Sequence, residues 1–439
     1  MTHATASSTE PRLLHDGNFR WMLAGAIASN LGDQFTLLAL PWVVLQMTAD
    51  PLQLGLVLLL IGVPRAVFIL LGGAIVDRHS PQRVLMLSKH ANTMLLAMLA
   101  GAIATGGLSL PLLHALALCL GVAAAFGIPA ATSMLPQVVA LAQLPAANGL
   151  MMGLRQLTLF IGPLLAGLLV ALASDGMPTP GAPSRGLALA FALDALSFVV
   201  SAWTLSRVTA RPAPAAAAGR QAVLAAMSDG LRSFWADRDL RAFLGYGALV
   251  TLFVGGPLHV ALPVLASSHP ALGPAALGTM LGAHGAGTLA GMALAGARPR
   301  WRVGTLGLTI LTLDAVVGLL VMPLGHVGAA WQGAALLLAI GALGGFMQVL
   351  VFSWLQQRVA PAMMGRAMAV FMFVFVGLAP LSGAATGALL RGLPVPTLFV
   401  AAGALLTGMA LLARLGSRMR GLGGLPAGPA PVVPDVAER

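Results

Sequence analysis

Charged residues are scarce in this chain of 439 residues: 8% are Asp, Glu, Lys or Arg, whereas 58% are hydrophobic and the mean hydropathy is +0.91. A soluble globular domain carries about 25% charged residues, so the composition excludes that class and indicates an integral membrane protein. Cysteine is almost absent, because Cys119 is the single example. One cysteine excludes an intrachain disulfide and a cysteine-cluster metal site.

The motifs of catalysis are also missing. The apolar runs show no paired aspartates, no His/Glu spacing suited to a metal and no glycine-rich phosphate loop beside a lysine. We therefore expect neither an enzyme, nor a bound metal or other cofactor, nor a nucleotide site for ATP-driven work in this chain.

What the sequence has in abundance is long apolar runs. A helix needs about 20 apolar residues to cross a hydrocarbon core of about 30 Å. The first run is long and lies behind Arg12 and Arg20, which differs from a cleaved signal peptide. Twelve predicted spans cover residues 20–47, 52–76, 84–105, 110–131, 147–173, 186–206, 242–267, 274–297, 303–324, 331–355, 366–390 and 395–414.

The net charge of +11 follows the predicted topology. If the N-terminus is cytoplasmic, nearly all basic residues fall in inner loops and only Arg185 and Arg391 lie outside, as the positive-inside rule requires. Both termini are then cytoplasmic, in a bacterial inner membrane. The arginines are spread over separate short loops instead of gathering on one face, which argues against nucleic acid. The inner set is Arg78, Arg83, Lys89, Arg207, Arg211, Arg220, Arg232, Arg238, Arg241, Arg298, Arg300, Arg302, Arg358, Arg366, Arg414, Arg418 and Arg420.

The longest polar interruption divides the predicted spans into six and six. The predicted fold is an all-α membrane protein with two six-helix halves. The interruption contains a flexible link, "RPAPAAAAGR", followed by an amphipathic basic stretch that suits a helix on the inner membrane surface. Parallel six-helix repeats around a central site are a transporter architecture. The predicted regions are an N-terminal tail at 1–19, bundles at 20–206 and 242–415, a linker at 207–241 and a disordered Gly/Pro-rich tail at 416–439.

One loop motif and three further segments resemble the major facilitator superfamily. "GGAIVDRHSPQR" is similar to that family's loop between helices two and three, carried here by Gly73, Asp77, Arg78 and Arg83. Ser80 replaces the usual second glycine. "SNLGDQFTLLALPWVVLQ", "IPAATSMLPQVV" and "ALDALSFVVSAW" resemble the bacterial branch that contains macrolide efflux proteins and the enterobactin exporter.

The resemblance implies a secondary carrier with an inner gate. Asp77 at a helix boundary can accept hydrogen bonds from exposed amides and neutralise the positive N-terminal end of a helix. By resemblance its partner is the start of helix eleven, at Arg366. Asp77, Arg78 and Arg366 are thus expected to form a cytoplasmic latch that holds the outward-facing state, the alternative being a topology anchor alone.

Ionisable residues inside the spans are the stronger functional signal, because each is costly at the bilayer centre unless it faces protein or water. At about 1.5 Å per residue, Asp33 lies about 20 Å from Arg20 and Arg65 about 18 Å from Asp77, so adjacent helices hold both at similar depth. Asp33 is the predicted proton-coupling residue, although a structural ion pair with Arg65 remains open. Arg155, beside Gln156, is predicted to hold an anionic cargo group or to pair with a carboxylate. The alternative is a buried tether to backbone carbonyls.

Other polar residues have weaker claims. Asp194 and Asp314 fall on helices that support the bundle from outside by resemblance, so both are predicted to be mainly structural. Gln34 and Gln348 offer hydrogen bonds to a cargo. His284 is a candidate proton carrier, with a packing role as the alternative.

"IGPLLAG" in the fifth span, with Gly162, Pro163 and Gly167, resembles a shortened antiporter motif. Proline bends a helix, and glycines let it pack closely against its neighbour. The prediction is proton-coupled export of an amphiphilic drug-like, macrolide-like or siderophore-like molecule by a monomer, driven by the proton gradient. Import of a metabolite or lipid flipping is the alternative within transport, and a transport-inactive receptor or scaffold is the alternative outside it.

Overall fold

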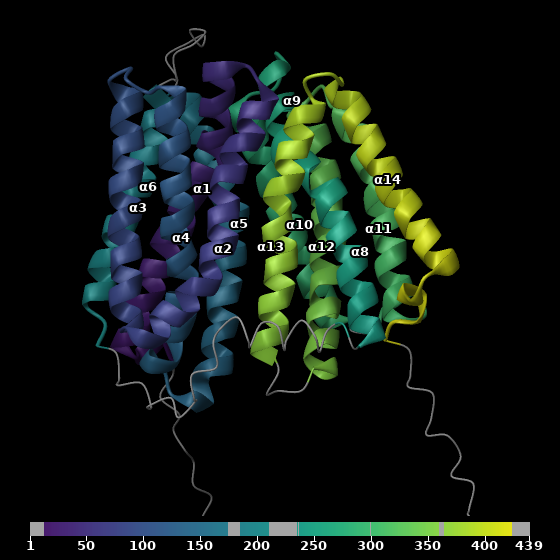
Figure 1. Cartoon of the computed structure of the whole chain (residues 1–439), viewed down its shortest axis with the longest axis horizontal. Coiled ribbons are helices and arrows are strands. Elements are labelled where there is room, and N and C mark those ends of the chain that lie inside the picture. The colour runs from purple at the N-terminus through teal and green to yellow at the C-terminus, as the bar shows by residue number, and fades with distance from the viewer. Residues whose placement is uncertain are drawn as a thin grey trace, which may run out of the picture.

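The computed structural model describes residues 13–173, 185–209, 235, 237–298, 300–359 and 364–423. Within this part the chain is helical, and long helices run side by side (Figure 1). Ten helical segments are long and apolar enough to cross a membrane: Pro51–Phe68, Pro81–Ala104, Leu110–Val138, Leu141–Leu172, Arg185–Ser206, Arg238–Ser268, Leu306–His326, Ala330–Arg358, Val370–Leu389 and Val395–Gly416.

The first six long helices form what we call the N-terminal half. Asp16 caps the first of them by accepting hydrogen bonds from the amides of Asn18 and Phe19. Within this half α1 packs on α6 and α5, α2 on α4, and α3 on α6 and α4. The helices are α1 (Gly17–Thr48), α2 (Pro51–Arg78), α3 (Pro81–Ala104), α4 (Leu110–Val138), α5 (Leu144–Leu172) and α6 (Arg185–Ser206).

The remaining helices form the C-terminal half, which lies beside the first (Figure 1). Here α10 packs on α12, α11 on α14, and α13 on α8. Arg358 at the end of α12 pairs with Asp237 and Asp239 at the start of α8, at 2.9 and 3.2 Å. The helices are α8 (Arg238–Gly256), α9 (Leu262–Ser268), α10 (Pro274–Ala297), α11 (Leu306–Val321), α12 (Ala330–Arg358), α13 (Met364–Leu389) and α14 (Val395–Gly416).

We call the end of the bundle where α1 begins the inner end and the end where α1 finishes, at Thr48, the outer end, after the predicted orientation. The described chain starts and finishes at the inner end (Figure 1). Long helices occupy every predicted span, but α1 and α10 do not meet the same test of apolarity. Polar residues such as Asp33 and Gln34 lower the hydropathy of α1, and glycines with His284 lower that of α10.

Two expectations from the sequence differ from the structure, and a third lies mostly outside the described residues. The charged segment at Asp77 and Arg78 is helical, since α2 continues to Arg78 and only two residues separate it from α3. The predicted span at 242–267 is interrupted between α8 and α9 by a π-helical turn, η3 (Pro257–Ala261). The predicted surface helix of the linker falls, except for residues 235 and 237–241, outside the described residues.

The start of the predicted disordered tail is ordered. Residues Arg418–Gly421 form a 3-10 helix, η6, and the side chains of Met419 and Leu422 are almost fully buried. The Gly307 amide of α11 donates a hydrogen bond to the Leu422 carbonyl over 3.0 Å. Two apolar side chains and a backbone contact therefore fix a segment whose composition alone suggested disorder, whereas residues 424–439 lie outside the described part.

Candidate functional site

The two halves touch through glycine-rich contacts at the outer end. A Cβ atom added to Gly167 on α5 would lie 2.6 Å from the Pro274 carbonyl oxygen and 2.9 Å from the Gly278 Cα on α10. A Cβ on Gly55 of α2 would lie 2.8 Å from the Ala384 Cα on α13. Only glycine permits backbones to approach this closely. These contacts close the outer end between the halves.

An ion pair lies over this closure. The Arg391 Nε, after α13, donates a hydrogen bond of 3.0 Å to Asp50 Oδ1, and its Nη2 donates to the other carboxylate oxygen. Asp50 also accepts a bond of 2.9 Å from the Leu52 amide at the start of α2. The hydrogen bond from Arg391 holds the pKa of Asp50 below its ordinary value of 3.8. The pair joins the outer loop between α1 and α2 to the C-terminal half.

Asp33 lies deeper in the molecule, on α1. Its side chain is solvent-exposed although it lies deep among the helices, and Leu37, one turn further along the same face, is 48% exposed. The following residues Leu38 to Leu40 are almost fully buried. Exposure at this depth means that Asp33 faces an accessible space inside the molecule, below the closed outer end.

Three cations surround Asp33. It interacts electrostatically with Lys89 on α3, Arg65 on α2 and Arg155 on α5. At about 1.5 Å per residue, Asp33, Arg65 and Lys89 lie about 21–23 Å from the outer ends of their helices, and Arg155 about 25 Å. The four charges thus occupy nearly one level, as the sequence predicted for Asp33 and Arg65.

Lys89 corrects one expectation from the sequence, which counted it among the loop cations. It lies within α3, where its ammonium donates to the Ser29 hydroxyl over 3.3 Å and sits 5.4 Å from the centre of the Phe198 ring. Ser29 belongs to α1 and Phe198 to α6, so the lysine points into the N-terminal half. A lysine only five residues from the charged loop looked like part of that loop, and its helical phase was the signal that could have placed it inside.

Asp194 extends the charged cluster from α6. It is 1% exposed, accepts hydrogen bonds from the hydroxyls of Thr36 and Ser197, and interacts electrostatically with Asp33. Gly32 of α1 leaves room for it, because an added Cβ there would collide with Asp194 and Ser197. The sequence rated Asp194 as structural, and its hydrogen bond from Thr36 of α1 fits that role, but its electrostatic interaction with Asp33 also makes it part of the candidate site.

Asp33 and Arg65 do not form the direct ion pair that remained open from the sequence. The described ion pairs within 4.0 Å do not include them, and the buried Nε of Arg65 has no hydrogen-bond partner. Two amides nearby are also unsatisfied, since the Oε1 atoms of Gln34 and Gln156 are buried without a partner. The predicted residues therefore lie in one region without satisfying all of one another's hydrogen-bonding groups.

The predicted motif of the fifth span lies where α5 meets both halves. A Cβ on Gly162 would collide with the Gln34 side chain of α1, whereas Gly167 contacts α10. Pro163 lies between them and is buried. Arg155 is exposed on the face of α5 that carries Gly162 two turns further on, which directs it toward α1 and the accessible space. The role of this motif in proton exchange stays a prediction.

Two histidines in the C-terminal half interact with each other. His284 is half-buried on α10 and interacts electrostatically with His259 of the π-helical turn η3. His259, like Asp33, is solvent-exposed although it lies deep among the helices. Reasoning from the sequence missed His259, although two prolines close by marked the interruption. Gln348 is half-buried on α12, and its predicted cargo contact stays a prediction.

Asp314 has a partner that the sequence did not reveal. The Tyr246 hydroxyl on α8 donates a hydrogen bond of 2.8 Å to Asp314 Oδ2 on α11, and both side chains are buried. The single tyrosine of the chain thus satisfies a carboxyl group within the C-terminal half, away from the cluster around Asp33. This contact agrees with the structural role predicted for Asp314.

The predicted inner gate lies at the opposite end. Gly73, Asp77 and Arg78 fall on the last turns of α2, and Arg366 near the start of α13, but their side-chain surroundings are outside the described part of the structure. Arg83, at the start of α3, is exposed. The latch formed by Asp77, Arg78 and Arg366 therefore stays a prediction.

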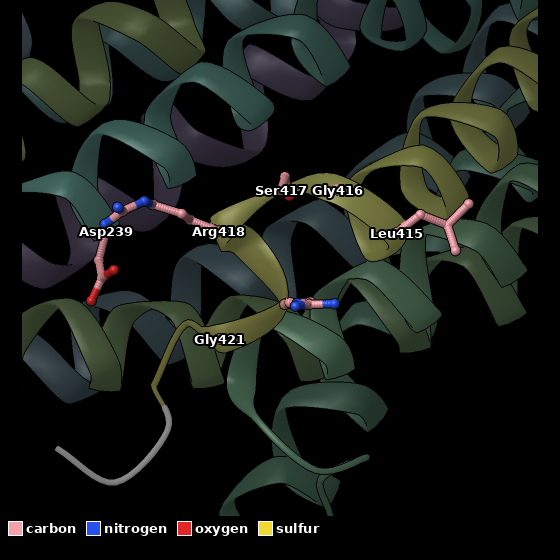
Figure 2. A pocket seen from close by; sticks show the side chains of 7 residues that line it. Asp239, Leu415, Gly416, Ser417, Arg418 and Gly421 are labelled. Carbon is pink, nitrogen blue, oxygen red and sulfur yellow. The ribbon is translucent and has the colours of Figure 1, made fainter. Parts of the chain in front are cut away.

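A separate pocket of about 370 Å³ lies at the inner end of the C-terminal half. Leu415 to Arg418, Arg420 and Gly421 line it together with Asp239, and the Arg418 side chain extends in the direction of Asp239 (Figure 2). It opens between η6 and α8, far from the charged cluster around Asp33. No group of three or more His, Cys, Asp or Glu residues that could hold a metal occurs in the described ranges.

Helices in two halves, closed together at one end over an internal charged site, define a multi-pass membrane transporter of the major facilitator type. Solved structures share this fold. A bacterial homologue of the iron transporter ferroportin is 19% identical with a TM-score of 0.69, covering 91% of this chain and 98% of that one. A bacterial homologue of the human lysosomal transporter Spinster is 16% identical with a TM-score of 0.68, covering 95% and 100%.

The sequence identifies the family. The profile of the family described as "Transmembrane secretion effector" matches residues 7–421, and the chain belongs to this family. It is 28% identical to the multidrug efflux pump Tap of Mycobacterium tuberculosis over 376 residues, covering 82% of this chain and 84% of the pump. Tap of Mycolicibacterium fortuitum is 28% identical over 240 residues, 54% of this chain and 55% of that pump. The protein is thus a secondary transporter and not an enzyme.

Proposed function

We propose that this protein exports an amphiphilic small molecule from the cytoplasm in exchange for protons, by alternating access. In this proposal α1 and α10 also cross the bilayer, which gives twelve spans in two six-helix repeats with both termini in the cytoplasm of a bacterial cell. One chain is the working unit, and the proton gradient drives it without a resident cofactor. The cargo is drug-like, macrolide-like or siderophore-like.

The observation that carries the proposal is the cluster around Asp33. A carboxylate that is reachable from an internal space, with Lys89, Arg65 and Arg155 around it, can take up and release a proton while its neighbours rearrange. Isolated charges inside a membrane are costly and mark ion or substrate pathways. The similarity to the multidrug efflux pumps named Tap supports efflux as the direction.

The closed outer end supports alternating access. Close backbone packing at Gly167 and Gly55, with the Asp50–Arg391 pair above it, blocks access from outside in the state described. The charged site then faces inward, ready for a cargo from the cytoplasm. Opening these contacts and closing the predicted inner latch would present the same site to the outside.

The test is proton release from acid-loaded inside-out vesicles when lipophilic drugs and siderophores are added. Wild type is compared with Asp33→Asn, and Asp314→Asn serves as the control, because Asp314 is a buried carboxyl group away from the site. We expect cargo-triggered release in wild type and in the control, and none in Asp33→Asn. Absence of proton release, together with uptake of a solute or lipid by intact cells, would instead favour an importer or a flippase.

A further inference from the structure

The helix that passes from α8 to α9 is interrupted near its middle. Between Gly256 and Leu262 the backbone forms the π-helical turn η3, with Pro257 at its start and Pro263 just beyond it. The Gly256 amide donates a hydrogen bond of 2.7 Å to the Ser382 hydroxyl of α13. A π-helical turn inside a membrane helix is uncommon and is found mostly at functional sites, and broken helices bind cargo in several transporter folds.

This turn lies at the junction of the two halves. A Cβ atom on Gly383 of α13 would lie 3.5 Å from Val260 Cγ2 of the turn and 3.8 Å from Leu58 Cδ1 of α2. Val260 is fully buried in this contact, whereas His259 beside it is solvent-exposed in the middle of the molecule. The His259 side chain therefore faces an accessible space between the halves.

His259 of the C-terminal half and Asp33 of the N-terminal half lie at different depths below the outer end. His259 lies nine residues from Ser268, about 14 Å from the outer end of α9, whereas Asp33 lies about 22 Å from the outer end of α1. His284 lies ten residues from the outer end of α10, about 15 Å, at the depth of His259. A cargo molecule that extends about 8 Å along the bundle axis would reach both His259 and Asp33.

We propose that His259, next to His284, forms the part of the cargo site that the C-terminal half contributes. Its imidazole hydrogen-bonds an uncharged hydroxyl, carbonyl or amide group of the cargo. An imidazole can donate through one ring nitrogen and accept at the other, so it suits such groups. The charged contacts belong to the N-terminal half, through Asp33 and its cations. This inference rests on the proposed export function and adds the polar chemistry of the cargo.

Thiol labelling tests the location without requiring transport. Cys119, the single cysteine, is replaced by alanine, and His259→Cys, Asp33→Cys and Val260→Cys are introduced one at a time. A membrane-impermeant maleimide is then added to inside-out vesicles. We expect labelling at positions 259 and 33 and none at the buried position 260. Labelling at 33 without labelling at 259 would overturn the shared space.

Binding tests the chemistry. We expect an uncharged macrolactone to slow the labelling of His259→Cys, and tetraphenylphosphonium, which has no hydrogen-bonding group, to leave it unchanged. With purified protein, His259→Ala should weaken macrolactone binding about tenfold, which corresponds to 1.4 kcal/mol. His90→Ala, on the exposed face of α3, is the matched control and should bind like wild type.

Two results would contradict the proposal at this stage. The first is labelling at position 259 that the macrolactone does not slow. The second is equal macrolactone affinity in His259→Ala and His90→Ala. A carrier that binds as expected but releases no protons would contradict the proposed exchange and leave the assignment of His259 standing, so the two failures are distinguishable.

Discussion

The closed outer end depends on glycine at position 167, and Gly167→Ala is expected to open it. The added Cβ would lie 2.6 Å from the Pro274 carbonyl oxygen and 2.9 Å from the Gly278 Cα, so α5 and α10 must separate in the outer-closed state. Overpacking of this kind costs about 1–3 kcal/mol. Alanine also raises helix propensity by about 1 kcal/mol, but this gain is the same in both conformations of the carrier and cancels.

Only the outer-closed state carries the collision, so the whole cost shifts the conformational equilibrium. At 1.4 kcal/mol for each factor of ten, about 1–3 kcal/mol moves the ratio of outer-open to outer-closed molecules by about 5- to 150-fold. Spin labels at Gly107→Cys and Gly328→Cys, in a Cys119→Ala background, report the separation of the two halves at the outer end. A Cβ meets only Thr105 Oγ1, at 3.5 Å, at position 107 and nothing at position 328.

We expect the long-distance population to grow in Gly167→Ala. Gly101→Ala is the matched control, because an added Cβ on this α3 glycine meets nothing within 4 Å, and its distances should equal those of wild type. Unchanged distances in a folded Gly167→Ala protein would refute the view that this close approach holds the outer end shut.

Three further outcomes follow from the described contacts. Because Arg391 lowers the pKa of Asp50 below its ordinary value of 3.8, the pair that favours the outer-closed state should persist down to that pH and break only as the outer pH falls further, through the lowered pKa. Arg391→Gln should open the outer end already at neutral pH, and equal spin-label distances for both proteins across this range would contradict the assignment. Tyr246→Phe leaves the buried Asp314 carboxyl group without its hydrogen-bond donor and should lower the free energy of unfolding by about 1–3 kcal/mol. The melting temperature in detergent should fall, and melting like wild type would argue against this bond. Lys89→Met removes a cation beside Asp33 and should abolish cargo-triggered proton release, whereas Lys89→Arg should retain part of this release. Full activity in Lys89→Met would exclude the lysine from the site.

Much of the fold was predictable because apolar length governs a membrane helix. Predicted and observed ends mostly agree within a few residues, as for the span at 274–297 and helix α10. The interruption at Pro257 was missed, because its apolar residues continue through the turn and the length of the run outweighed the prolines. The order at Met419 was missed as well, since it comes from tertiary burial against α11 and not from local composition.

The candidate site was predictable in its members more than in its contacts. Asp33, Arg65 and Arg155 stood out because charge is expensive in a membrane, and the structure brings them to one level. Lys89 was missed because a lysine near a helix end usually reaches the surface. The Tyr246–Asp314 contact joins residues 68 positions apart on two helices, and such a pairing depends on helix packing that one sequence does not encode locally.

The central claim is exchange of cargo for protons through Asp33, and purified protein in liposomes tests it most directly. With a proton gradient imposed across the membrane, we expect a radiolabelled cargo to accumulate on the acidic side in wild type and not in Asp33→Asn. Accumulation on the alkaline side would show movement together with protons and contradict export by exchange. Equal accumulation in wild type and Asp33→Asn would remove Asp33 from the coupling step.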